Sequence, residues 1–163
     1  MKIKIFVTGG TIDNLDYTSK TKAPKKQKSL IPDLLEQSRI TADYSVEKVL
    51  FKDSKFISDK DRRLIFKKCK KCKENKIIIT HGTTTMTITS KFLGKSGLGK
   101  TIVLVGSAVP ANKYKSDALF NLGFAFAAVQ VLPKGTYIAM NGKIFSWKNV
   151  RKHLKTGFFE KEK

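Results

Sequence analysis

Four short, mostly apolar runs, each followed by a polar loop and a helical pattern, constrain the fold of this chain most strongly. They lie at residues 2–7, 44–51, 76–80 and 100–106. Runs that are close to continuously apolar are typical of strands in a parallel sheet buried on both faces. The chain is therefore predicted to have an α/β fold: a doubly wound, mostly parallel Rossmann- or flavodoxin-like sheet with helices on both faces, plus a C-terminal hairpin.

Capping and turn signals place the remaining elements. Ser29 is expected to cap a short amphipathic helix, and Ser58 with Asp61 forms an S-x-x-D start for a helix that runs to about residue 73. The other predicted segments are helices over 84–93 and about 116–129, a hairpin over 135–145 with a type I′ turn at Asn141-Gly142, a polar loop over 13–28 and a basic tail.

The composition indicates one soluble globular domain, here predicted to span residues 1–163. A hydrophobic content of 40% is that of a folded protein. No apolar run approaches the roughly 20 residues of a membrane span. The N-terminal stretch MKIKIFVTGG has too short an apolar segment for a signal peptide. We therefore expect a cytoplasmic protein without a membrane partner.

The net charge of +20, from 33 Lys and Arg against 13 Asp and Glu, raises the question of a polyanionic partner such as tRNA. Arginine recognises phosphates and base edges through paired hydrogen bonds, and it occurs only at positions 39, 62, 63 and 151. A surplus made of lysine favours solubility or biased composition over nucleic-acid binding.

Cys69 and Cys72 form a C-x-x-C motif inside a lysine-rich helical run. The sequence has no second cysteine pair and only two histidines, His81 and His153. Because residues i and i+3 share one face of a helix, both thiols are expected to pack on the core side, not to bind a metal or act in redox chemistry. No metal or organic cofactor is expected.

Polar loops rich in Gly and Thr follow all four predicted strands. In a doubly wound sheet, the loops at the carboxyl ends of the strands meet at a ligand crevice. These loops are TGGTI at 8–12, KDS at 52–54, HGTTTM at 81–86 and GSAVP at 106–110.

The hydroxyl groups in these loops suggest a site for nucleophilic chemistry. Thr11 is a candidate nucleophile if a base or cation lowers its pKa, and the Gly-Gly turn before it exposes backbone N–H groups to an oxyanion. Thr83 is a second hydroxyl at a helix N-terminus, and Ser54 can hydrogen-bond a small anionic group. The alternative is that these residues are ordinary helix caps. That alternative accounts well for any single loop, but less well for all four loops together. A P-loop is not predicted, since GKSGLGKT at 94–101 precedes its strand.

Two motifs in order, TGGTI at 8–12 and ITHGTTTM at 79–86, resemble the signature motifs of bacterial-type L-asparaginases. KDS at 52–54 resembles the substrate-binding loop of that family, and VGSAVP, SDALFNL and YIAMNGKIF continue the likeness. The resemblance covers nearly the whole chain. It is closest to short members that keep only the N-terminal domain of the usual two-domain subunit, so no C-terminal domain is expected.

The resemblance implies hydrolysis of the side-chain amide of L-asparagine, or of L-glutamine, without a cofactor, in a homodimer or homotetramer. It assigns Thr11 as the acylating nucleophile, Tyr17 as the partner of its hydroxyl and Thr83 as the second catalytic threonine. Ser54 would hold the substrate α-carboxylate. The full set of substrate-binding residues implied in this way is Gly10, Asp53, Ser54, Gly82 and Thr83.

Three departures from the family pattern bear on activity. The family motif is HGTDTM, so Thr84 replaces a carboxylate that binds the substrate α-ammonium and belongs to the second catalytic set. Loss of one charge-assisted contact, worth roughly 1.5–3 kcal/mol, predicts an activity about 10- to 100-fold lower. Ungapped alignment puts Val129 where the catalytic lysine would be, with Lys152 or Lys134 as substitutes. The acidic partner from a neighbouring subunit's C-terminal domain is also missing.

Two other functions remain open at the level of sequence. One is a non-catalytic relative that binds a small amide or amino acid. The other is a tRNA-linked amidase subunit like those of Glu-tRNA(Gln) amidotransferases, which the charge of +20 suits. Thr84 is compatible with natural divergence and with designed inactivation.

Overall fold

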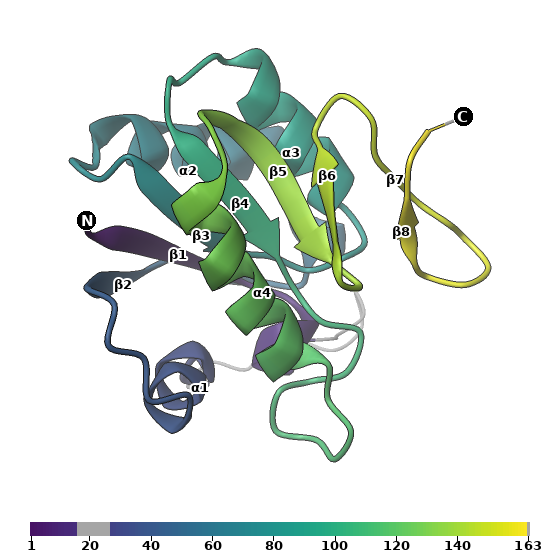
Figure 1. Cartoon of the computed structure of the whole chain (residues 1–163). Helices are drawn as coiled ribbons and strands as arrows, with labels where there is room; N and C mark the ends of the chain where they lie inside the picture. Colours follow the sequence, from purple (N-terminus) through teal and green to yellow (C-terminus); the bar gives the residue numbers. More distant parts are fainter. Residues whose placement is uncertain (16–26, 163) are drawn as a thin grey trace.

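Six strands form the main sheet, in the order β2-β1-β3-β4-β5-β6. In the computed structural model, which describes residues 1–15 and 27–162, the first five strands are parallel and β6 is antiparallel to β5 (Figure 1). The strands are β1 Ile3–Gly9, β2 Tyr44–Lys52, β3 Lys76–Thr80, β4 Thr101–Val105, β5 Gly135–Met140 and β6 Lys143–Ser146. The order 2-1-3-4-5 of the parallel strands is flavodoxin-like, so the predicted fold class is confirmed.

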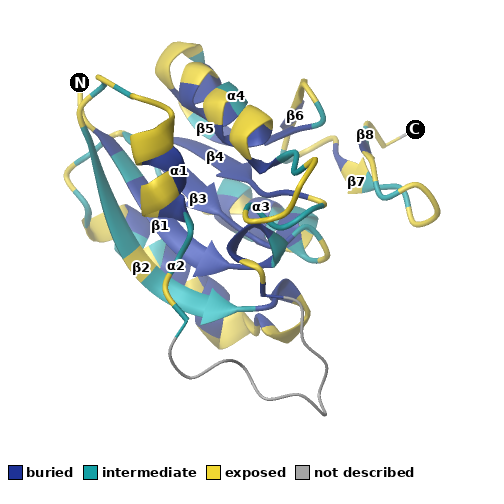
Figure 2. Cartoon of the chain, turned by 90° about the horizontal axis from the view of Figure 1, so that it is seen from below, coloured by how far each residue is buried: buried dark blue, intermediate teal, exposed yellow. Residues whose placement is uncertain are grey.

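Helices cover both faces of the sheet (Figures 1 and 2). The helices α1 (Ile31–Gln37) and α4 (Ala118–Val131) lie on one face, and α2 (Asp59–Lys71) and α3 (Met86–Lys95) lie on the other. The connection from β1 to β2 through α1 and the connection from β4 to β5 through α4 move across the sheet in opposite directions. Both helices nevertheless lie on the same face of the sheet. The two crossovers therefore have opposite hands. The β4-α4-β5 unit is the left-handed one, an exception to a rule that holds in about 98% of cases.

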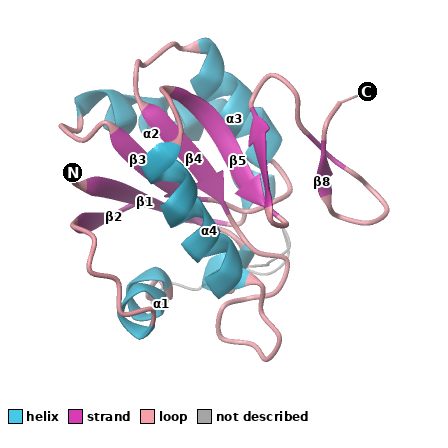
Figure 3. Cartoon of the chain, in the orientation of Figure 1, coloured by secondary structure: helices cyan, strands magenta, loops and turns pink. Residues whose placement is uncertain are grey.

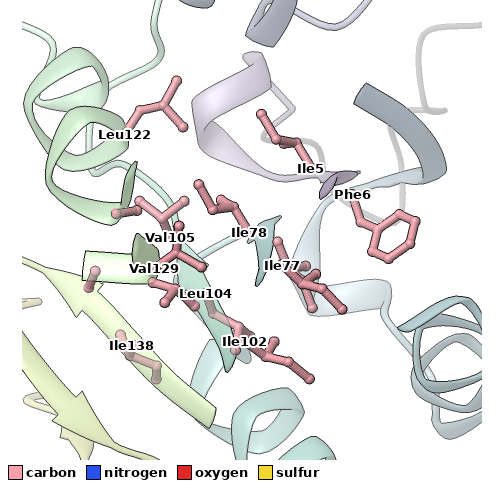
Figure 4. Close-up of a cluster of buried hydrophobic side chains, with 14 of the residues drawn as sticks. Ile5, Phe6, Ile77, Ile78, Ile102, Leu104, Val105, Leu122, Val129 and Ile138 are labelled. Atoms are coloured by element: carbon pink, nitrogen blue, oxygen red, sulfur yellow. The ribbon is translucent and has the colours of Figure 1, made fainter. Parts of the chain in front are cut away.

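The core consists of aliphatic side chains on the two faces of the central strands. Ile5 pairs with Ile78 in the parallel register, so both side chains point to the same face of the sheet. Figure 4 shows Ile78 and Val105 close to Leu122 and Val129 of α4. These side chains are almost completely buried. The edge strand β2, in contrast, is only partly buried along its length (Figure 2).

The predicted helix starts agree with the structure to within two residues. Ser58 Oγ accepts from the Asp61 N–H, and Asp61 Oδ2 accepts from the Ser58 N–H, so the predicted capping box opens α2. The prediction for Ser29 was wrong by one position. Leu30 occupies the cap of α1, while the Ser29 hydroxyl accepts from the Ile31 N–H and donates to Asp13.

Both later helices begin two residues after their predicted starts, because the residues before them hold loops in place. Thr85 Oγ1 donates to the Ser54 carbonyl at 2.8 Å, just ahead of α3. The Asp117 carboxylate accepts from the N–H groups of Ala108 and Val109, just ahead of α4. These bonds tie the helix starts to the carboxyl edge of the sheet.

The two cysteines are free and lie on the core side of α2, as predicted from their spacing. Cys69 is completely buried, and Cys72 packs against the core from the end of the helix. Burial raises the pKa of the Cys69 thiol to about 12. This thiol is therefore protonated at neutral pH and behaves as an apolar core residue.

The end of the chain is folded, in contrast to the predicted basic tail. Asn141 and Gly142 have φ values of 56° and 69°, which confirms the type I′ turn between β5 and β6. Beyond β6, strands β7 (Arg151–Lys152) and β8 (Phe159–Glu160) form a second, smaller hairpin (Figure 1). Phe159 is buried, and its N–H donates to Asn141 Oδ1 at 3.0 Å. Strands of two residues are too short to leave a periodic pattern in the sequence.

Candidate active site

The loops that follow β1, β2 and β3 are in contact at two glycines, Gly10 and Gly82. Figure 3 draws the loops of the chain in pink, between the magenta strands and the cyan helices. A Cβ atom on Gly10 would lie 2.3 Å from the Gly82 nitrogen, and one on Gly82 would lie 2.5 Å from Ser54 Oγ. Any side chain at these two positions would collide, so the loops can meet only because both residues are glycine. Gly10 also has a φ of 88°, which other residues rarely adopt.

A cavity of about 350 Å³ opens between these loops and the C-terminal hairpin. This volume accommodates a small molecule. The wall combines loop residues at the carboxyl ends of the strands with residues of the second hairpin. It is lined by Thr11, Asp53, Lys55, Thr83, Thr84, Ala108, Met140, Asn141, Lys152, Thr156, Gly157 and Phe158.

Lys152 and Thr83 form a hydrogen-bonded pair on the cavity wall. Lys152 Nζ donates to Thr83 Oγ1 at 2.9 Å, although the two residues are 69 positions apart in the chain. Partial burial removes water from the ammonium group and lowers the pKa of Lys152 below its ordinary value of 10.5. The lowered pKa increases the fraction of neutral amine, which is the form that can accept a proton from a hydroxyl.

Three charged side chains line the described part of the cavity: Lys55, Lys152 and Asp53. Asp53 Oδ1 accepts from the Lys55 N–H at 2.9 Å, and Asp53 Oδ2 lies 3.1 Å from Lys55 Nζ. The side chain of Asp53 is 7% exposed. Thr84 is exposed and contributes a neutral hydroxyl. The described lining therefore has two lysines and one carboxylate, and that carboxylate is paired with Lys55.

A buried chain of hydrogen bonds connects His81, in the loop that carries Thr83, to helices α2 and α3. His81 is fully buried, with Nδ1 2.8 Å from the Gly82 carbonyl oxygen and Nε2 2.9 Å from Thr89 Oγ1. Desolvation lowers the pKa of His81 to about 4, so the imidazole is neutral at neutral pH. Since a carbonyl can only accept, Nδ1 carries the proton and Nε2 accepts from Thr89. Arg62 Nε donates to the same hydroxyl at 3.3 Å, which completes the chain.

The structure brings most of the predicted site residues to this cavity. Gly10, Ser54 and Gly82 belong to the loops that carry the wall residues but do not line the cavity themselves, and Ser54 is only 1% exposed. Tyr17 lies outside the described residues. The predicted residues on the wall itself are Thr11, Asp53, Thr83, Thr84 and Lys152.

The structure corrects the ungapped alignment of the catalytic lysine. Val129 lies in α4, where its side chain is completely buried against the sheet (Figure 4). Lys134 directly precedes β5 and therefore lies at the amino edge of the sheet, opposite the cavity. Lys152 is the lysine of the three that reaches Thr83. The alignment failed because the amine arrives from a two-residue strand beyond the β5–β6 hairpin and not from the helix.

Sequence reasoning missed several wall residues. Lys55 directly follows the KDS motif, and its place in that loop was a usable signal. Asn141 was assigned to a turn, and it also lines the cavity. Thr156, Gly157 and Phe158 belong to the second hairpin, which no sequence pattern indicated.

A doubly wound sheet with two threonine hydroxyls and an amine at its carboxyl edge defines this chain as an α/β protein with a hydroxyl-based site. The family "Asparaginase, N-terminal" matches residues 2–159. Glutaminase-asparaginase of Acinetobacter glutaminasificans is 32% identical over 93% of this chain and 50% of its own length. L-asparaginase 2 of Bacillus subtilis is 30% identical over 92% of this chain and 43% of its own. This chain belongs to the asparaginase family.

Solved structures agree with this assignment. The thermostable L-asparaginase from Thermococcus kodakarensis matches 99% of this chain and 51% of its own length, with a TM-score of 0.84 and 30% identity. The probable cytoplasmic L-asparaginase from Campylobacter jejuni matches 98% of this chain and 51% of its own, with a TM-score of 0.80 and 32% identity. The chain thus spans about half the length of these relatives.

Within residues 1–15 and 27–162, no group of three or more His, Cys, Asp or Glu could hold a metal ion. In the same part of the chain, no helix has the length and apolar character needed to cross a membrane.

Proposed function

We propose that this chain is an amidohydrolase that cleaves the side-chain amide of L-asparagine to L-aspartate and ammonia. The observation that carries the proposal is the 2.9 Å contact between Lys152 Nζ and Thr83 Oγ1 in a cavity that Thr11 also lines. An amine of lowered pKa beside a hydroxyl is an arrangement that moves protons in acyl transfer. The names of the relatives, L-asparaginase and glutaminase-asparaginase, support the same reaction.

In the proposed mechanism, Thr11 Oγ1 attacks the amide carbon of the substrate. The proton of Thr11 passes through the Thr83 hydroxyl to the neutral amine of Lys152 and then to the amide nitrogen, which leaves as ammonia. A water molecule next hydrolyses the ester on Thr11. Thr83 and Lys152 accept the proton of this water and return a proton to the Thr11 oxygen as the ester breaks. Backbone N–H groups near Gly10 and Gly82 would stabilise the oxyanion in both steps.

Substrate binding is proposed for the loop that follows β2. The resemblance assigns the α-carboxylate to Ser54, which is buried and does not line the cavity. Its neighbour Lys55, held by Asp53, is the cationic residue of this loop on the wall. Thr84 has no charge to offer the α-ammonium. The activity toward L-asparagine is therefore proposed to be about 10- to 100-fold below that of a site with a carboxylate at this position.

The test is ammonia release from L-asparagine and L-glutamine by the parent and by Thr11→Val, which keeps the side-chain shape and removes the hydroxyl. Thr41→Val, at an exposed position before β2, is the matched control. We expect activity in the parent and the control and none in Thr11→Val. Added hydroxylamine should divert the ester to β-aspartohydroxamate in the parent and in the control, and not in Thr11→Val. Turnover that survives in Thr11→Val would contradict the assignment of the nucleophile.

A non-catalytic binding protein is the competing function. Calorimetric titration with L-asparagine separates the two, since binding without ammonia release in the parent and in Thr84→Asp would replace the hydrolase by a binder. An increase in kcat/KM in Thr84→Asp would support the hydrolase.

We also propose that residues 1–163 act as one asparaginase N-terminal-type domain in a cytoplasmic homodimer or homotetramer. The helix α4 exposes an uncharged apolar face, with Leu119, Phe120 and Val131 exposed to 40%, 64% and 80%. Exposed apolar faces of this kind mark contact surfaces. The word "cytoplasmic" in the name of the Campylobacter jejuni structure supports the location. Light scattering on the parent and on Phe120→Lys would test the assembly.

A further inference from the structure

We infer that this cavity selects amides by charge and favours an anionic substrate, a monoamide of a dicarboxylic acid without an ammonium group, over a zwitterionic amino acid. The inference rests on the proposed hydrolase function and specifies the substrate class of the same site.

The first observation is the charge of the wall. Its described residues provide the ammonium groups of Lys55 and Lys152 and the single carboxylate of Asp53. Both oxygens of that carboxylate are engaged by Lys55, through its N–H and its Nζ. Since Asp53 is almost fully buried, it offers little to a second cation. With Lys152 protonated, the described wall carries an excess of one positive charge. With Lys152 neutral, as the proposed mechanism requires, Lys55 and Asp53 balance, and the positive contributions that remain are the helix start and the net charge of the chain.

The second observation is the start of α3. The helix has ten residues and no acidic residue in its first turn, and no side chain caps it. Thr85 occupies the N-cap position, but its hydroxyl donates a hydrogen bond to the Ser54 carbonyl and does not cap the helix. Thr83 and Thr84, which precede this helix, both line the cavity. The positive end of the helix dipole thus adds to the charge of the two lysines.

The third observation is the charge of the whole chain. A net charge of +20 favours the approach of anions to the protein and disfavours that of cations. A carboxylate on the substrate gains from all three contributions. An ammonium group on the same substrate shares the cavity with Lys55 and, while Lys152 is protonated, with a second ammonium group. The difference is expected to be about 10-fold in kcat/KM for each unit of substrate charge.

The experiment compares three amides that differ by one charged group each. Succinamate is L-asparagine with hydrogen in place of the α-ammonium, and 3-aminopropanamide is L-asparagine with hydrogen in place of the carboxylate. Ammonia release by the parent protein should follow the order succinamate, L-asparagine, 3-aminopropanamide. The preference for succinamate should narrow when the ionic strength is raised, since salt screens charges that water can reach.

Matched variants assign the selectivity to the wall. Thr84→Asp adds a carboxylate and should shift the ratio of succinamate to L-asparagine at least about 10-fold toward L-asparagine. Thr84→Asn has nearly the same size and no charge, and it should keep the order of the parent. Lys55→Gln should lower the preference for succinamate, whereas Lys134→Gln, at the opposite edge of the sheet, should not.

The outcomes separate this inference from the function on which it rests. Absence of ammonia from all three amides would overturn the hydrolase function. Release with L-asparagine preferred over succinamate would overturn the charge selectivity alone and leave the hydrolase in place. An equal shift in Thr84→Asp and Thr84→Asn would show that size, not charge, sets the preference, and would also overturn the inference.

Discussion

Replacing Lys152 by methionine tests the central contact of the site. The substitution removes the amine, keeps a chain of similar length and abolishes the 2.9 Å hydrogen bond to Thr83 Oγ1. A general base contributes about 100- to 10,000-fold to a rate, or about 2.7–5.4 kcal/mol of transition-state stabilisation. The side chain is only partly buried, so the free energy of unfolding should change by less than about 1 kcal/mol. A loss of activity without unfolding is therefore expected.

The assay is steady-state ammonia release, with kcat/KM measured for each variant and thermal unfolding measured in parallel. Lys134→Met is the matched control, because Lys134 precedes β5 at the other edge of the sheet. Lys152→Arg is the second variant. Arginine keeps the positive charge but stays protonated, so it cannot act as a base. Both Lys152 variants should lose activity, and Lys134→Met should retain it.

Two results would refute this reasoning. If Lys152→Met kept kcat/KM within about 3-fold of the parent, the amine would not be the base. If Lys152→Arg remained active while Lys152→Met did not, Lys152 would act through its charge and not through proton transfer.

Further predictions concern pH, loop contact and stability. Desolvation lowers the pKa of Lys152 below 10.5, and the fraction of neutral amine increases as the pH rises through that pKa. A plot of kcat/KM against pH should therefore rise with a midpoint below 10.5, and the same plot for Lys152→Met should lack this rise. Gly82→Ala would place a Cβ 2.5 Å from Ser54 Oγ, and ammonia release should fall by about 100-fold or more as the loops separate. Gly123→Ala meets no atom within 4 Å in α4 and should raise the free energy of unfolding by about 0.5–1 kcal/mol in urea titrations. Ser58→Ala removes the cap of α2 and should lower the free energy of unfolding by about 1 kcal/mol, measured in the same urea titrations.

The strands and most helices of this fold could be predicted from the sequence. The runs at 2–7, 44–51, 76–80 and 100–106 correspond to β1 to β4 within about two residues. For β1, β3 and β4 the reason is burial on both faces, which demands an apolar run, whereas the edge strand β2 is only partly buried. The face chosen by α4 could not be predicted. This helix is apolar around most of its circumference and both faces of the sheet are apolar, so neither partner favours one hand of the crossover.

The loop residues of the candidate site were also accessible to sequence reasoning. Thr11 and Thr83 directly follow parallel strands, and parallel strands bring their carboxyl ends to one edge. The lysine was not accessible in the same way. The chain has 33 Lys and Arg, of which four are Arg, and neither spacing nor periodicity singles out one amine among so many.

By itself, the sequence of this protein determined its sheet, the threonine-rich edge and the neutral residue at position 84, since these depend on local pattern and strand order. Only the tertiary structure decided that Lys152, and neither Lys134 nor a residue of α4, donates to Thr83. It also decided that the pKa of this lysine is lowered and that Lys55 faces the same cavity. Contacts across 69 residues and the removal of water from an amine arise only when distant segments fold together.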